Sequence, residues 1–176
     1  MKDAQTGIIE ALKYAIQMEL DGKKFYTLSG RESTNKIGKE LFTWLAEQED
    51  FHRKRFEDIY EHIVQKKGWP VTQVKPDRNS TFRTLFGEAI RNSGTSLKAQ
   101  KSEFIAAEKA IEMEIKSRNF YTERAGIATS DVEKNFFTSI STEEQGHYLA
   151  LIDYKEYMSD PEGWFTRTEH HSLDGN

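Results

Sequence analysis

The sequence has 176 residues, a formal net charge of −4 and no cysteine. The absence of cysteine excludes disulfides, thiolate zinc sites, iron–sulfur clusters and cysteine catalysis. The mild, interspersed charge gives neither a basic surface for nucleic acid nor a polybasic patch for a membrane. No apolar run reaches transmembrane length, and residues 1–10 show no secretory signal, so we expect a cytoplasmic protein.

Two helices are predicted in the first part of the chain. Residues 6–30 form the first, because apolar side chains recur at helical spacing: Ile9, Leu12, Ile16 and Leu20. Glu19 lies at the edge of this stripe, with Gly22 nearby to leave room beside a carboxylate. Thr34 or Asn35 caps a second helix over about residues 35–67, which Gly68 ends.

The remaining chain predicts a long crossover and two more helices. Residues 68–100 hold Pro70 and Pro76 and are long enough to run the length of a bundle and return. Helices follow over about residues 102–125 and 131–158, the latter capped by Ser130 or Asp131. We therefore expect an all-α antiparallel four-helix bundle over residues 1–158, with a C-terminal tail, residues 159–176, packing on it.

A Glu-x-x-His motif occurs on both the second and the fourth predicted helices. It is formed by Glu49 with His52 and by Glu144 with His147. On a helix this spacing puts a carboxylate and an imidazole on one face, as a pair of metal ligands requires.

The two motifs are related by an internal repeat. When the chain is shifted by 95 residues, fifteen of the 48 positions from Ala11 to Asp58 are identical to their partners, and both motifs coincide. The same shift superimposes Glu19 on Glu114 and Tyr26 on Tyr121. A duplicated helix pair is the simplest interpretation.

Four helices thus carry a symmetric set of six candidate metal ligands: Glu19, Glu49, His52, Glu114, Glu144 and His147. One Glu from each of two helices and Glu-x-x-His from each of the other two is the pattern of a carboxylate-bridged dinuclear site. Carboxylates offset the charge of two divalent cations, and imidazole suits iron, although manganese or zinc would also fit.

Other interpretations exist for each of these residues. A single Glu is most often a solvated helix residue, and a single buried His is more often hydrogen-bonded than a ligand. Glu143 also shares a face with His147, but the repeat selects Glu144. Tyr26 and Tyr121 lie two turns beyond Glu19 and Glu114 and could donate hydrogen bonds to ligating carboxylates, or could be core aromatics.

At these residues the sequence resembles the rubrerythrin-like branch of the ferritin-like superfamily, over roughly residues 6–158. The ending Pro161-Glu162-Gly163-Trp164-Phe165 is similar to that of short, single-domain members. The resemblance implies a ferritin-like bundle with the long crossover between its second and third helices. It also implies a non-haem diiron centre, with two iron ions per chain held by these six residues, that reacts with hydrogen peroxide or oxygen as a peroxidase or ferroxidase. A homodimer is expected.

Two departures from the family pattern bear on activity. Peroxide-reducing rubrerythrins usually carry an extra Glu three residues after the ligand of the third helix, where this chain has Ser117. The rubredoxin domain with its four cysteines is absent, so turnover would need an external electron donor, such as a rubredoxin-like protein. The alternative function is a non-catalytic bundle that binds iron, manganese or zinc as a buffer, sensor or carrier.

Overall fold

Four long helices make up the part of the chain that the computed structural model describes, residues 2–70 and 101–164, with side chains from residue 6 onward. They are α1 (Lys2–Glu32), α2 (Lys36–Val64), α4 (Lys101–Gly126) and α5 (Asp131–Ser159). None of these helices has the length and hydropathy needed to cross a membrane.

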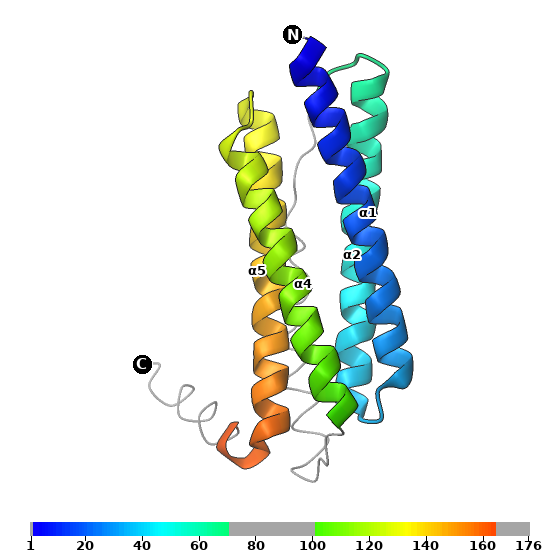
Figure 1. Cartoon of the computed structure of the whole chain (residues 1–176), viewed down its shortest axis with the longest axis vertical. Coiled ribbons are helices and arrows are strands. Elements are labelled where there is room, and N and C mark those ends of the chain that lie inside the picture. The colour runs from blue at the N-terminus through cyan, green and yellow to red at the C-terminus, as the bar shows by residue number, and fades with distance from the viewer. Residues whose placement is uncertain (1, 71–100, 165–176) are drawn as a thin grey trace, which may run out of the picture.

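The helices form two antiparallel hairpins that lie side by side (Figure 1). α1 packs mainly on α2, and α4 packs mainly on α5, while fewer contacts join one hairpin to the other. The predicted all-α bundle with a long connection between its second and third helices is confirmed. Most of the predicted crossover, residues 71–100, and of the predicted tail, residues 165–176, lies outside the described residues.

The helix ends follow the capping residues. Asn35 accepts a hydrogen bond from the Gly38 amide at 2.6 Å and begins α2, and Ser130 accepts one from the Glu133 amide at 3.3 Å and begins α5. α2 ends at Val64, a little before the predicted end near residue 67, because Lys66 adopts a positive φ of 58°.

A buried carboxylate fixes the start of α4 to the turn between α1 and α2. Oε1 of Glu103 accepts hydrogen bonds from the backbone amides of Thr34 and Asn35, at 2.9 and 3.2 Å. The Asn35 side chain and the Ser33 hydroxyl donate to the same oxygen, at 2.7 and 2.9 Å. This contact joins the two hairpins at one end of the bundle.

Two hydrophobic clusters fill the interior, one towards each end. The first is centred on residues such as Leu41, Phe42, Leu151 and Tyr154. The second is centred on residues such as Leu12, Phe56, Phe136 and Ile140. On every helix the candidate ligands fall between the residues of one cluster and those of the other, so apolar packing encloses a polar layer at mid-length.

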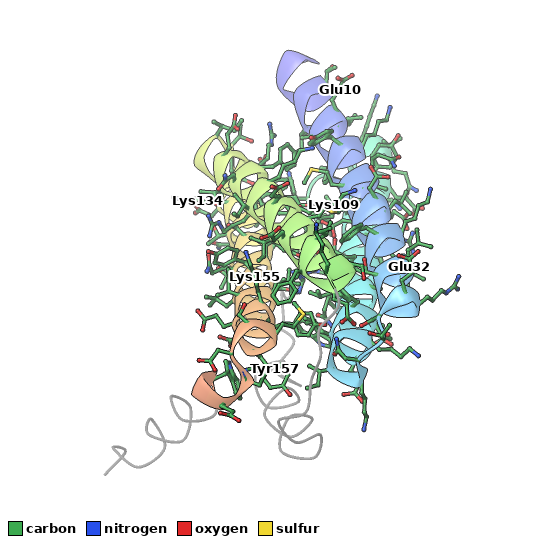
Figure 2. The ribbon with its side chains drawn as sticks, turned by 60° about the horizontal axis from the view of Figure 1, so that its bottom comes forward. Glu10, Glu32, Lys109, Lys134, Lys155 and Tyr157 are labelled. Atoms are coloured by element: carbon green, nitrogen blue, oxygen red, sulfur yellow. The ribbon has the colours of Figure 1, made fainter. Side chains whose placement is uncertain are left out.

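The phase of α1 differs from the predicted stripe. Leu20 is 41% exposed, whereas Ile8, Leu12 and Ala15 are buried and Glu19 is only 1% exposed. The helix is therefore turned so that Glu19 faces the interior rather than lying at its edge. Labelled charged side chains such as Glu10, Glu32 and Lys109 lie on the outside of the bundle (Figure 2).

Candidate metal centre

All six predicted ligands meet in the polar layer between the hairpins. They form two adjacent groups, one of Glu19, Glu49, His52 and Glu144 and the other of Glu49, Glu114, Glu144 and His147. Within each group, the potential ligand atoms lie within 4.8 Å of one another. Every one of these side chains is buried.

The two groups share Glu49 and Glu144, which are the carboxylates of the two Glu-x-x-His motifs. Glu19 and His52 belong to one group alone, and Glu114 and His147 to the other. The imidazoles of His52 and His147 stack with their centroids 5.4 Å apart. A carboxylate with two oxygens can contact one cation with each, so the arrangement suits two neighbouring ions linked by two carboxylates.

The atoms that face this centre lack hydrogen-bond partners within the described protein. They are Glu19 Oε2, Glu49 Oε1, His52 Nδ1, Glu114 Oε2, both Glu144 carboxylate oxygens and His147 Nδ1. Nδ1 of His52 lies 3.0 Å from Glu144 Oε1, yet neither atom has a hydrogen-bond partner. Buried polar atoms rarely remain unpaired, so a converging set of orphaned oxygen and nitrogen atoms fits bound cations.

Electrostatics lead to the same conclusion. The pKa of Glu114 is raised to about 8, because burial disfavours the charged carboxylate and Glu144 adds like-charge repulsion. Burial and the nearby carboxylates of Glu19 and Glu144 also raise the pKa of Glu49. Glu49 and Glu114 therefore ionise readily in this dry layer only when cations lie beside them.

The two predicted tyrosines reach the carboxylates of the opposite hairpin. Tyr26 on α1 donates a hydrogen bond to Oε1 of Glu114, and Tyr121 on α4 donates one to Oε1 of Glu19. Burial first, and then the neighbouring carboxylates, hold the pKa of both phenols well above the ordinary value, so the hydroxyls keep the protons they donate. The partner oxygen of each carboxylate, Oε2, faces the centre.

Gly22 provides room for a carboxylate, but for a different one from that predicted. A Cβ at this position would lie 2.5 Å from Oε2 of Glu49 on α2, so the absence of a side chain lets Glu49 approach α1. The sequence indicated space beside Glu19, one turn earlier on the same helix.

Glu143 has a role that the repeat did not reveal. Its Oε2 lies 3.0 Å from Nε2 of His52, the ring nitrogen that points away from the centre. Arg55 Nη1 donates to both Glu143 oxygens, at 3.0 and 2.9 Å. Burial would raise the pKa of Glu143, but His52 and Arg55 outweigh it and hold the pKa at about 2, so this side chain is a carboxylate. It contacts His52 across the hairpins and not His147 on its own helix.

The fold and this geometry define a class of protein: antiparallel four-helix bundles whose two adjacent buried clusters of Glu and His suit a dinuclear metal site. Residues 10–155 match the family described as Rubrerythrin. The chain belongs to the rubrerythrin family, whose members are mostly diiron peroxidases. No curated protein and no solved structure matches it. With no cysteine, the chain has no ligands for a rubredoxin iron site.

Proposed function

We propose that the protein is a non-haem diiron oxidoreductase that reduces hydrogen peroxide or oxygen. The sharing of Glu49 and Glu144 between two adjacent buried clusters supports this proposal most strongly, because it suits two ions held close together. Glu19 and His52 would complete the coordination of one ion, and Glu114 and His147 that of the other. Iron fits a donor set of carboxylates and imidazoles.

Two bound irons would supply the redox chemistry, since oxidation of two Fe(II) to Fe(III) provides the two electrons that, with two protons, convert one hydrogen peroxide to two waters. The protein side chains hold and shield the pair. Tyr26 and Tyr121 orient Glu114 and Glu19 by hydrogen bonds, and the hydrophobic clusters on either side exclude water.

Electrons for repeated turnover would come from a separate reductant, such as a rubredoxin-like protein. Ser117 stands where the family pattern has an extra Glu, one turn beyond Glu114. This substitution favours a second candidate, a bundle that binds metal without catalysing turnover. In that case the iron pair of each chain would be oxidised once, and peroxide consumption would then stop.

Repeated consumption of peroxide separates the two candidates. The protein is loaded anaerobically with Fe(II) and mixed with excess hydrogen peroxide and a reduced rubredoxin, and peroxide and donor oxidation are followed together. An oxidoreductase consumes many equivalents of peroxide per iron pair, with two electrons drawn from the donor for each. Consumption that ends after one equivalent per pair would leave the metal-binding bundle.

The Glu144→Ala variant gives the control, because Glu144 belongs to both clusters. We expect it to lose both ions and all peroxide reduction. Glu108→Ala, on the exposed surface of α4, should retain both.

A further inference from the structure

The two histidines of the centre differ in the hydrogen bonding of Nε2, the ring nitrogen that faces away from the centre. Nε2 of His52 meets the Glu143 carboxylate at 3.0 Å. Within the described residues, no side chain makes a hydrogen bond with Nε2 of His147, whose Nδ1 faces Glu49, Glu114 and Glu144 at 3.4–3.6 Å. The site is therefore symmetric in its six predicted ligands but asymmetric one layer further out.

Glu143 is itself firmly held. Arg55 binds both of its oxygens, and the Ser139 hydroxyl donates to Oε1 at 3.0 Å. The side chains of Glu143 and Arg55 are each only 16% exposed. The carboxylate lies between the guanidinium and the imidazole, so its negative charge is nearer to the metal centre than the positive charge of Arg55.

The residues that hydrogen-bond to one another behind His52 have no counterparts at the repeat-related positions. A shift of 95 residues superimposes Glu143 on Gln48 and Ser139 on Trp44, and it superimposes Arg55 on Ala150. Trp44 packs edge-on against the His147 ring, with centroids 5.3 Å apart. The residues related by the repeat to Glu143, Ser139 and Arg55 therefore cannot form the same network of a carboxylate, a hydroxyl and a guanidinium around His147.

The difference has a direct consequence for metal binding. A carboxylate that only accepts a hydrogen bond fixes the proton of His52 on Nε2 and leaves the Nδ1 lone pair free for a cation. The same hydrogen bond orients the ring and increases its basicity as a ligand. Among the residues that the structure describes, no carboxylate makes a comparable hydrogen bond to Nε2 of His147.

We infer that the two metal positions are inequivalent, with the position at His52 binding a divalent cation more tightly than the one at His147 because Glu143 positions and polarises His52. This inference rests on the proposed function only in taking the six residues as ligands of two ions. Glu143 acts through His52 and is a positioning residue.

Variants that keep one position at a time provide the test. Glu114→Ala removes a ligand of the His147 position alone, and Glu19→Ala removes one of the His52 position alone. Dissociation constants for Co²⁺, which binds without being oxidised, are measured in both variants with a competing chelator. We expect Co²⁺ to bind about 10- to 100-fold more tightly to Glu114→Ala than to Glu19→Ala.

Glu143→Gln is then added to each background. In Glu114→Ala it should weaken Co²⁺ binding by about 10- to 100-fold, and in Glu19→Ala it should leave the constant within about twofold. Gln48→Ala, the variant at the repeat-related position, should have little effect in either background. Circular dichroism is recorded to check that each variant keeps its helices.

Proton NMR of the Co²⁺-loaded single-site variants gives a readout that a purely structural role would not change. The shifted Nε2–H proton of His52 should exchange slowly with solvent in Glu114→Ala and faster after Glu143→Gln. Equal Co²⁺ affinities in the two single-site backgrounds, or equal weakening of both by Glu143→Gln, would overturn the inference. If either result is found while the unaltered protein binds two irons and turns over peroxide, the inference fails but the proposed function stands. If the unaltered protein binds no pair of metal ions, both the inference and the proposed function fail.

Discussion

Tyr26 and Glu114 join the two hairpins directly at the candidate metal centre. The phenol on α1 donates to Oε1 of a carboxylate 88 residues away on α4, and that carboxylate presents its other oxygen to the centre. Tyr121 makes the reciprocal contact with Glu19. Because relatively few contacts otherwise join the hairpins, these bonds couple the packing of the two halves to the geometry of the ligands.

Loss of the Tyr26 hydroxyl should therefore weaken metal binding. We expect Tyr26→Phe to lower the affinity for Co²⁺ by about tenfold or more, since Glu114 loses the partner that orients it. Tyr154→Phe is the matched control, because Tyr154 is equally buried but accepts a hydrogen bond from Asn35, outside the centre. Equal affinities for Tyr26→Phe and the unaltered protein would contradict this role.

Addition of a single methyl group at Gly22 should disrupt the centre. The new Cβ of Gly22→Ala would lie 2.5 Å from Oε2 of Glu49, so Glu49 must move. We expect fewer than two irons per chain by metal analysis, with the helical circular dichroism retained.

Gly146→Ala is the control for that substitution. Gly146 lies between Glu144 and His147 in sequence, but a Cβ there would meet nothing within 4 Å. This variant should bind two irons. Its free energy of unfolding should be about 0.5–1 kcal/mol higher than that of the unaltered protein, because alanine is more stable than glycine within a helix. Loss of metal from both glycine variants would show that the effect is not specific to Glu49.

The buried Glu103 should matter for stability rather than for metal. Glu103→Ala leaves the amides of Thr34 and Asn35 without their acceptor, and we expect the free energy of unfolding in urea to fall by about 1–3 kcal/mol. Glu108→Ala, on the same helix as Glu103, removes an exposed ion pair with Lys155 of α5 and should cost under about 1 kcal/mol. Equal losses in the two variants would argue against the role of Glu103 at the turn.

Removal of metal by chelation should make stability depend on pH. The folded-state pKa of Glu114 is about 8 against an ordinary value of 4.5, so between these values the folded chain holds a proton that the unfolded chain has released. Protons favour the folded form there, and stability should fall as the pH rises from about 5 to 8. His147 changes stability with pH in the same direction. Burial lowers its pKa, but Glu114, Glu144 and Glu49 together raise the pKa well above the ordinary value.

Thermal unfolding by circular dichroism across this pH range checks the prediction. With excess chelator, the midpoint should decline towards pH 8. With metal bound, the decline should disappear, because the cation takes the place of the protons. A chelated protein that becomes more stable towards pH 8 would contradict the assigned electrostatics.

The sequence predicted the bundle and the meeting of the six residues because both depend on a pattern that the chain carries twice. Identity at a spacing of 95 residues includes Glu19, Glu49 and His52, and antiparallel hairpins bring repeat-related positions to the same level. The sequence could not predict the role of Glu143, because its contact with His52 crosses between hairpins and its repeat-related residue is Gln48.

The error at α1 has a different cause. Ile9 and Ile16 are only partly buried and pack on the flank of the hydrophobic cluster, while Ala15 is fully buried. The interior face runs through Ile8, Leu12, Ala15 and Glu19, so a stripe that continues from Leu12 through Ile16 to Leu20 is displaced from it. Helical periodicity locates a helix well, but its inward face is uncertain where alanine and glycine line it.

The most direct test of the diiron account is a count of iron oxidised by peroxide. The protein is reconstituted anaerobically with Fe(II), its metal content is measured, and hydrogen peroxide is titrated while the Fe(III) absorption is recorded. We predict two irons per chain, both oxidised by one equivalent of peroxide, and no such absorption in Glu144→Ala. Fewer than one metal ion per chain, or tight zinc binding with no spectral change on addition of iron and peroxide, would contradict the account.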